Sequence, residues 1–374
     1  MAKILVLYAT AGIGHKKAAY AIKEAFDEVR EKDVQMEDSL DYTSGFFKAS
    51  YNATYLFFIK YIPLIWGLFY YLLDVTWFYN IFIRPLRRLT NLINTRQLVR
   101  FLIESKPEMV IVTHFLALEV IADLKRKGLF TAPLIAVVTD YKSHTFWLSD
   151  LADYYVAASE YTKVDLVKRG IRPERILVYG IPCGRGFSEE RDRGKGLLKI
   201  GLDPSKKTLF VLSGGFGVGP IKGVTLEMDK SPADFQGIVV CGYNKELEGK
   251  IKTIAKDARH KFKVYGFVDN VDELMHYSDV LVSKPGGIST TESLAAEVPM
   301  IVMKPIPGQE MRNYKFLEQN HAALKIKKPE EIVSVLDGLF ESGKLEDLKK
   351  NIKKIRCAHS AEKIVDFCEE HVGK

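Results

Sequence analysis

The sequence predicts an α/β protein made of two successive, doubly wound domains. Short apolar runs typical of buried parallel strands alternate with segments of helical periodicity. This alternation occurs twice, and a stretch rich in glycine and charge, residues 184–196, separates the two sets. With 374 residues, the chain is long enough for two domains that each bury a core.

The first set begins with the apolar run Ile4–Tyr8, which leads through a glycine-containing turn into a helical segment at residues 16–30. Further strand-like runs follow at 109–113, 134–139 and 154–157. The second set has strand-like runs at 208–212, 238–241, 264–265, 280–282 and 300–303.

These elements indicate an N-terminal domain over residues 1–186 and a C-terminal domain over residues 197–356, with a cleft between them. The final segment, 357–374, is expected to be a helix. Its position in the sequence leaves open whether it crosses back onto the first domain.

The composition limits the classes of partner. A net charge of +7 and a pI near 8.9 suit a nucleotide diphosphate or an acidic membrane surface, and we expect no nucleic acid. The four cysteines lack CxxC spacing, which argues against a structural zinc site and a disulfide framework. The N-terminus shows no signal peptide, which favours the cytoplasm.

One region is unusually apolar and aromatic. Residues 46–82 hold 15 of the 42 aromatic residues, and residues 75–103 contain five arginines and no acid. The longest uncharged run there, residues 61–73, has 13 residues, whereas a membrane span needs about 20. We therefore expect a face that lies on an anionic membrane surface, the alternative being an extra helical layer buried against the core. The residues expected to form this face include Trp66, Phe69, Trp77, Arg84, Arg87 and Arg88.

A glycine turn followed by a histidine, Gly12-Ile13-Gly14-His15, ends the first predicted strand and opens the first helix. Glycines let the backbone approach a ligand, and a helix N-terminus offers unpaired N–H groups. The helix dipole disfavours an imidazolium there, so the histidine stays neutral and basic. This favours His15 as a general base with Gly14 on the acceptor side. The alternative is a solvated histidine that caps the helix.

Two later loops have the composition of a nucleotide-sugar site. The loop from Ser283 to Glu292 follows a strand, and its N–H groups and hydroxyls suit a diphosphate, while Glu292 suits a ribose diol. The loop from Pro305 ends in Gln309 and Glu310, which can donate to and accept from sugar hydroxyls. Taken alone, an acid near a helix N-terminus and an ordinary Pro-Gly turn explain the same residues.

A third loop, residues 139–147, follows a predicted strand at the end where α/β domains bind ligands. Asp140 and His144 are candidates to orient an acceptor hydroxyl, and Trp147 to stack against the acceptor. A buried tryptophan beside a hydrogen-bonded aspartate is an equally good account.

In their order along the chain, these motifs resemble those of the monogalactosyldiacylglycerol synthase and processive diacylglycerol glucosyltransferase family, which is related to the peptidoglycan glycosyltransferase MurG. The resemblance covers almost the whole chain, and its most specific part is the pair of runs at 284–287 and 305–310. It implies a GT-B fold, with the acceptor bound by the N-terminal domain and a UDP-sugar by the C-terminal domain. It also implies an inverting transfer without a metal or cofactor, the UDP-sugar being a co-substrate.

The resemblance further implies roles for single residues. His15 would deprotonate the acceptor hydroxyl, Glu292 would hold the ribose, and Gln309 and Glu310 would hold the sugar. Asn244 would lie near the nucleotide. The other donor contacts would come from a flexible loop at Gly214 and Gly215, a uracil-facing run at Gly266, Phe267 and Val268, and a diphosphate-binding run at Gly287, Ile288, Ser289 and Thr290.

Two positions depart from the family pattern. Gly184 follows Ile181-Pro182-Cys183 where bacterial glucosyltransferases often have arginine, and Phe216 stands where they tend to have histidine. These departures affect the details of donor and acceptor contacts rather than the reaction class.

The expected reaction moves glucose or galactose from a UDP-sugar to 1,2-diacylglycerol, giving a β-glycosyl-diacylglycerol and UDP at the inner face of the cell membrane. The enzymatic alternatives are a GT-B transferase acting on a polyprenyl-linked acceptor and a nucleotide-sugar epimerase. The non-enzymatic alternative is a nucleotide-sugar sensor at the membrane.

Overall fold

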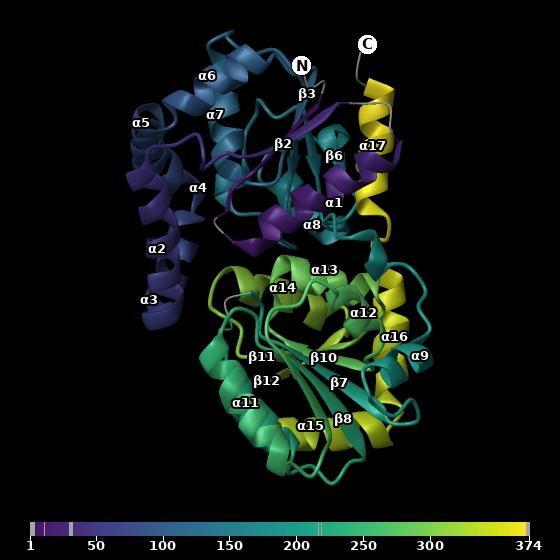
Figure 1. The fold of residues 1–374 in the computed structure, drawn as a ribbon. Helices are drawn as coiled ribbons and strands as arrows, with labels where there is room; N and C mark the ends of the chain where they lie inside the picture. The colour runs from purple at the N-terminus through teal and green to yellow at the C-terminus, as the bar shows by residue number, and fades with distance from the viewer. Residues whose placement is uncertain (1–3, 11, 30–32, 216, 218, 372–374) are drawn as a thin grey trace. The chain divides into compact units, whose positions relative to one another are not determined.

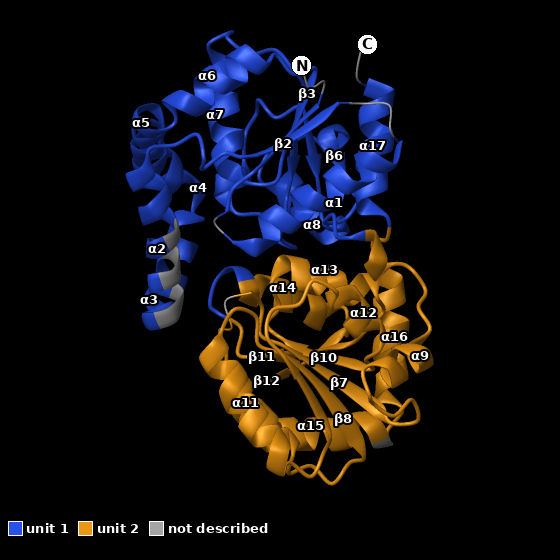
Figure 2. Ribbon diagram, in the orientation of Figure 1, with its two compact units in different colours: residues 1–184, 306–309, 359–374 blue, residues 185–305, 310–358 orange. Residues whose placement is uncertain are grey.

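The computed structural model describes residues 4–10, 12–29, 33–215, 217 and 219–371. Ala11 and Phe216, which belong to two of the predicted loops, lie outside the described residues. The chain forms two compact units, coloured separately in Figure 2. The first unit comprises residues 1–184, 306–309 and 359–374, and the second comprises residues 185–305 and 310–358.

The first unit contains a six-stranded parallel sheet in the order β2-β1-β3-β4-β5-β6 (Figure 1). Successive side chains of β1 point to opposite faces. Leu5 and Leu7 therefore join one hydrophobic core, and Val6 joins a second core on the opposite face of the sheet. The strands are β1 (Ile4–Tyr8), β2 (Val34–Asp38), β3 (Met109–Val112), β4 (Leu134–Val137), β5 (Tyr154–Val156) and β6 (Ile176–Leu177).

Helices connect these strands and cover both faces of the sheet (Figure 1). The apolar region forms a series of helices between β2 and β3 rather than one long helix. The helices are α1 (Ile13–Val29), α2 (Gly45–Tyr61), α3 (Pro63–Leu73), α4 (Thr76–Phe78), the π-helix η1 (Tyr79–Ile83), α5 (Arg84–Asn94), α6 (Arg96–Ser105), α7 (Phe115–Arg126), η2 (Thr145–Trp147), α8 (Glu160–Lys168), η3 (Pro173–Arg175) and α17 (Ser360–His371).

The C-terminal helix α17 packs against α1 within the first unit. Ile364 and Val365 of α17 share one hydrophobic core with Ala19, Ile22 and Phe26 of α1. Because His15 lies in the first turn of α1, the C-terminal helix supports the element that holds the predicted base.

The second unit repeats the architecture, with a six-stranded parallel sheet in the order β12-β11-β10-β7-β8-β9. Its strands are β7 (Lys207–Leu212), β8 (Phe235–Val240), β9 (Phe262–Tyr265), β10 (Val280–Ser283), β11 (Met300–Met303) and β12 (Ala323–Ile326). Its helical segments are η4 (Arg185–Phe187), α9 (Arg193–Lys199), α10 (Ile221–Met228), α11 (Lys245–Asp257), α12 (Val271–His276), α13 (Gly287–Ala295), α14 (Gln309–Gln319), α15 (Glu331–Glu341) and α16 (Lys344–Ile355). The first residue of α14, Gln309, belongs to the first unit.

The stretch 184–196 does not separate the units as an open linker, because most of it is folded onto the second unit. Helix α9 begins within it, and a Cβ atom added to Gly196 would overlap the ring of Tyr277. Close packing therefore requires glycine at this position. The second unit begins at Arg185, earlier than the composition indicates.

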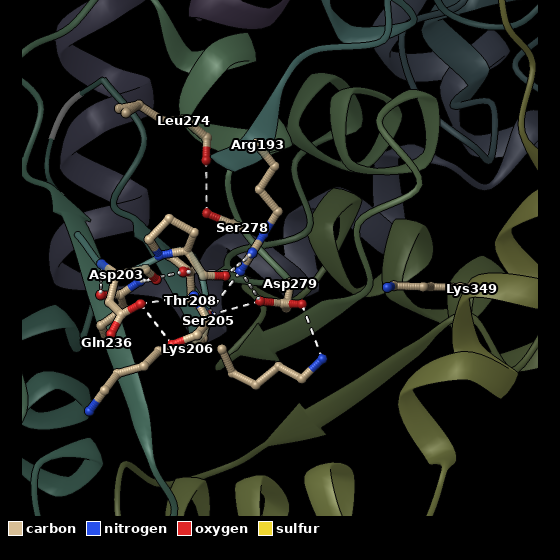
Figure 3. A network of polar contacts seen from close by, with 12 residues as sticks. Arg193, Asp203, Ser205, Lys206, Thr208, Gln236, Leu274, Ser278, Asp279 and Lys349 are labelled. Carbon is tan, nitrogen blue, oxygen red and sulfur yellow. Dashed lines mark hydrogen bonds and ion pairs between the residues drawn. The ribbon is translucent and has the colours of Figure 1, made fainter. Parts of the chain in front are cut away.

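A polar network anchors α9 to the sheet (Figure 3). Arg193 donates from Nη2 to the Asp279 carboxylate at 2.9 Å and to the Lys206 carbonyl at 3.0 Å. Asp279 also accepts the backbone N–H of Thr208 at 2.8 Å, and Gln236 of β8 donates to the Thr208 hydroxyl at 3.1 Å. The network thus joins the start of β7 to the residue before β10.

Replacing Asp279 with alanine should lower the free energy of unfolding of the second unit by about 2 kcal/mol, because the half-buried Arg193 and the backbone N–H of Thr208 lose their acceptor. Urea titration checks this value. The matched control is Asp234→Ala, whose exposed carboxylate pairs with Lys206 and should contribute far less to stability, because solvent screens this pair. Equal, small losses in both variants would contradict an anchoring role.

Candidate active site

Both sheets have a point where the strand order reverses, and α/β sheets bind ligands at such points, beyond the carboxyl ends of the strands. The order reverses between β1 and β3 in the first sheet, and between β7 and β10 in the second. The histidine loop follows β1, and the two glycine-containing loops at 213–217 and 284–287 follow β7 and β10. The predicted loops therefore lie at the two switch points.

The ring of His15 is held by the ends of two neighbouring strands. Its Nδ1 lies 2.7 Å from the carbonyl oxygen of Thr113, directly after β3, and 3.0 Å from the hydroxyl of Thr139, two residues after β4. The Thr113 hydroxyl donates to the His15 carbonyl at 2.9 Å. A carbonyl oxygen only accepts, so Nδ1 carries the proton and the lone pair lies on Nε2.

A second histidine, which the sequence analysis did not identify, lies against His15. The rings of His15 and His114 meet edge to face, with centroids 4.6 Å apart. His114 accepts the backbone N–H of Leu116 on its Nδ1 and thereby caps α7. The signal in the sequence was a polar pair, Thr113-His114, directly after an apolar strand.

Both imidazoles are neutral at physiological pH. Burial lowers the pKa of His15 from 6.5 to about 4, and the hydrogen bond to Thr113 offsets part of that shift. Burial also holds the pKa of His114 well below its usual range, and the neighbouring His15 lowers it further. His15 can therefore accept a proton without first losing one.

The other predicted acceptor residues have partners within the first unit. The Nε2 atom of His144 lies 3.1 Å from the carbonyl oxygen of Tyr70, and its Nδ1 atom accepts the N–H of Phe146. Both ring nitrogens therefore have partners. Trp147 is only 2% exposed and belongs to the hydrophobic core, as the alternative of a buried tryptophan predicts. Asp140 is buried and accepts from Gln309 Nε2 at 2.7 and 2.8 Å.

In the second unit, helix α13 presents its N-terminus at the switch point. Its N-cap is Gly286, which has no side chain to occupy the first N–H groups of the helix. A Cβ atom added to Gly286, or to Gly214 in the loop after β7, would meet no atom within 4 Å. The backbone is thus open to an approaching ligand, and such a terminus favours a phosphate. The diphosphate residues proposed from the sequence, Gly287, Ile288, Ser289 and Thr290, form the first turn of this helix.

The remaining donor residues occupy different environments. Glu292 is 2% exposed and lies on α13, whereas Glu310 is half-buried and lies 4.0 Å from Lys284 Nζ. Asn244 caps α11 by accepting the N–H of Leu247, so this side chain has a structural role. Gly215 accepts the N–H of Tyr243 on its carbonyl, which ties the loop after β7 to the loop after β8.

Two exposed aromatic rings stack in the second unit. Phe267, which follows β9, lies parallel to Tyr243, which follows β8, with centroids 4.3 Å apart. They are 54% and 63% exposed, and Val268 beside them is half-buried. Exposed, stacked rings offer a flat surface to a base. Tyr243 was not identified from the sequence, because only the folded sheet brings it next to Phe267.

The helices between β2 and β3 expose many apolar side chains. Asp74 joins this segment to the rest of the first unit, because its carboxylate accepts the N–H of Thr145 at 2.7 Å and pairs with Arg169 at 2.8 Å. No helix in the part of the chain that the structure describes is long and apolar enough to cross a membrane. The exposed apolar surface comprises Phe57, Leu64, Leu68, Phe69, Trp77, Ile81, Phe82, Leu86, Leu89, Leu92 and Ile93.

Helix α5 within this segment is amphipathic, but its apolar side faces solvent and its polar side faces the rest of the first unit. Its leucines point to solvent, while Arg87 and Asn91 point inward and both contact the Glu119 carboxylate, at 2.9 and 3.0 Å. The Arg87 guanidinium also lies 4.0 Å from the centre of the Phe146 ring. The structure therefore corrects the expectation that Arg87 faces anionic head groups. Its neighbour Arg88 remains half-exposed, with Nε 3.4 Å from Asp123.

Comparison with known proteins matches both units. Residues 15–183 match the family model of monogalactosyldiacylglycerol (MGDG) synthase, and residues 208–366 match the glycosyltransferase family 28 C-terminal domain. The processive diacylglycerol beta-glucosyltransferase of Bacillus licheniformis is 30% identical over 372 residues, which cover 98% of this chain and 94% of that protein. The Bacillus subtilis protein of the same name is 30% identical over 370 residues, with 97% and 94% covered.

The chain belongs to the monogalactosyldiacylglycerol synthase and processive diacylglycerol glucosyltransferase family. This confirms the resemblance found in the sequence, and the protein is a glycosyltransferase.

Solved structures support the fold. MurG of Acinetobacter baumannii superposes with a TM-score of 0.63 at 14% identity, covering 98% of this chain and 99% of that one. HepE of Anabaena in complex with UDP gives a TM-score of 0.56 at 16% identity, covering 98% and 100%. The family 28 glycosyltransferase thus has the predicted GT-B fold.

Proposed function

We propose that the protein transfers glucose from UDP-glucose to the free hydroxyl of 1,2-diacylglycerol, with inversion at the anomeric carbon. The relatives named above are diacylglycerol glucosyltransferases, which favours glucose over galactose. The observation that carries the proposal is the neutral His15, whose Nδ1 is engaged and whose Nε2 retains its lone pair.

In this reaction the acceptor hydroxyl passes its proton to His15 Nε2 while its oxygen attacks the anomeric carbon. The bond from that carbon to the β-phosphate oxygen breaks, and its electron pair leaves with UDP. The open N-terminus of α13 stabilises the negative charge that develops on the diphosphate. No step requires a covalent enzyme intermediate, so a single displacement inverts the configuration.

The donor residues divide by the part of UDP-glucose that they hold. Glu292 is assigned to the ribose, Gln309 and Glu310 to the glucose, and the Tyr243–Phe267 stack to the uracil. Glu292→Gln should then weaken binding of UDP itself by about tenfold or more, the contribution of one charge-assisted hydrogen bond. Glu310→Gln should weaken UDP-glucose and leave UDP almost unchanged.

Calorimetric titration with UDP and with UDP-glucose checks this division, since each variant keeps the size of the side chain. Equal losses of UDP affinity in both variants would contradict the assignment. A lowered melting temperature in the Glu292 variant alone would show that its buried carboxylate supports α13 instead.

The acceptor has two acyl chains and stays in the bilayer, so the enzyme has to work at the membrane surface. The exposed apolar surface over α3–α5 supplies the contact, with Arg84 and Arg88 beside anionic head groups. The reversed polarity of α5 supports this role, because exposed leucines are costly in water and favourable in a lipid interface. We place the enzyme on the inner face of the cell membrane.

The reaction is tested with isotopically labelled UDP-glucose and UDP-galactose, each offered with diacylglycerol vesicles, and the lipid products are identified by mass spectrometry. A monoglucosyl-diacylglycerol formed from UDP-glucose, with β-configuration by NMR, is the expected result. A product only with a polyprenyl-linked acceptor, or UDP-glucose binding without any product, would reject the proposal.

A further inference from the structure

Three neighbouring strands of the first sheet end around the imidazole of His15. His15 follows β1, Thr113 follows β3, and Thr139 follows β4, and these strands are adjacent in the order β1-β3-β4. Thr113 is fully buried and Thr139 is 4% exposed. The Nδ1 proton therefore lies between two oxygens, the Thr113 carbonyl at 2.7 Å and the Thr139 hydroxyl at 3.0 Å.

We propose that Thr139 is a positioning residue for glycosyl transfer, whose hydroxyl acts with the Thr113 carbonyl to hold His15 as the Nδ1–H tautomer with Nε2 toward the acceptor. This inference rests on the proposed function, because it assigns the base to that reaction. Thr139 does not contact the substrate and acts only through the ring of His15.

The two oxygens act at the moment of proton transfer. The acceptor O–H proton moves to His15 Nε2, the acceptor oxygen bonds to the anomeric carbon, and UDP leaves with the electrons of the broken bond. The ring is then a cation, and its Nδ1–H donates more strongly to both oxygens. Proton release from Nε2 to solvent returns the neutral ring.

Both oxygens that contact Nδ1 are neutral, and this affects the protonation state of the His15 ring before the reaction. A carboxylate beside Nδ1 would favour the protonated ring before the reaction begins. A carbonyl and a hydroxyl orient the same proton without that effect. The titratable group that faces the ring from the N-cap of α7 is His114, which is itself neutral and accepts the Leu116 N–H on its Nδ1.

The test compares Thr139→Val, which keeps the shape and removes the hydroxyl, with Thr139→Ser, which keeps the hydroxyl. We expect Thr139→Val to lower kcat about tenfold, the effect of one hydrogen bond of ordinary net strength, with an unchanged KM for UDP-glucose. Thr139→Ser should restore most of kcat. Thr225→Val is the matched control, because this buried hydroxyl donates only to the Ile221 carbonyl within α10.

A second measurement does not depend on activity. In protein labelled with ¹⁵N-histidine, the His15 signals, assigned by their loss in His15→Gln, should show a protonated Nδ1 and an unprotonated Nε2. In Thr139→Val they should shift toward a mixture of tautomers, whereas Thr225→Val should leave them unchanged.

Wild-type kcat together with wild-type nitrogen signals in Thr139→Val would overturn the inference. Equal losses of kcat in the valine and serine variants, with unchanged nitrogen signals, would overturn it too, because packing would then be the cause. If the wild type forms no glycolipid, the proposed function fails, while the nitrogen signals still decide whether Thr139 sets the tautomer.

Discussion

Replacing His15 with alanine is expected to lower kcat roughly 10²–10⁴-fold, the usual effect of losing a general base. The acceptor hydroxyl would then have to lose its proton to water while it attacks the anomeric carbon. UDP affinity should remain within about twofold of wild type, because the residues proposed to hold UDP itself belong to the other unit. Initial rates with diacylglycerol vesicles and calorimetry with UDP measure the two quantities separately.

The matched control is His359→Ala, which removes an exposed imidazole and should leave kcat unchanged. Near-normal turnover of the His15 variant would remove this residue from the mechanism. A large loss of both turnover and UDP affinity would point to a general loss of structure rather than loss of a base.

The same residue sets the expected pH profile. Because burial lowers the pKa of His15 to about 4, this proposed base should stay unprotonated from neutral pH down to about pH 5. The acid limb of kcat/KM due to this residue should therefore lie near pH 4 rather than near 6.5. The same shift makes stability depend on pH. As pH falls, the unfolded chain binds a proton at this histidine before the folded chain does. The free energy of unfolding should therefore decrease as pH falls from 6.5 toward 4.

Changing Leu86 and Leu89 together to glutamate is expected to abolish sedimentation of the protein with vesicles. Both side chains are exposed on the outer face of α5, at 58% and 55%. Losing the burial of two leucines in the lipid interface removes roughly 3 kcal/mol of membrane-binding free energy, equivalent to more than 100-fold in partitioning. Anionic lipid also repels the two added carboxylates. Turnover of diacylglycerol dispersed in detergent should largely survive.

The matched control for this surface is Leu129→Glu with Leu198→Glu, which changes the charge equally at two leucines that are 57% and 65% exposed elsewhere. Full vesicle binding by the α5 variant would show that this surface does not contact the membrane. Arg87 is not a useful probe, since its substitution would leave the half-buried Glu119 without its cation.

The strands and the candidate base could be predicted because local patterns determine them. The run Ile4–Tyr8 is apolar at every position, which is typical of a strand buried on both faces, and helices cover both faces of the sheet around it. His15 directly follows a glycine turn at the end of that strand. A parallel sheet brings such loops to its carboxyl edge regardless of the details of packing.

The chemical environment of the base could not be predicted. Thr113 and Thr139 are 98 and 124 residues from His15 in the sequence, and their shared contact with Nδ1 depends on the strand order β1-β3-β4. The same holds for the stack of Tyr243 on Phe267. Gly196 contributed to the prediction of a linker, whereas the structure shows close packing of this glycine against Tyr277. Linker flexibility and close packing both select glycine, so the sequence does not distinguish them.

The sequence by itself determined the α/β class, the two nucleotide-fold halves, the loops at their switch points and the family. Periodicity and short motifs encode these features locally. Only the tertiary structure decided which side of α5 faces solvent, because Arg87 and Asn91 are polar residues whose partner, Glu119, lies on a helix that is distant in the sequence. An ion pair that forms between distant elements reverses the usual rule that polar side chains point outward, and no local pattern can show it.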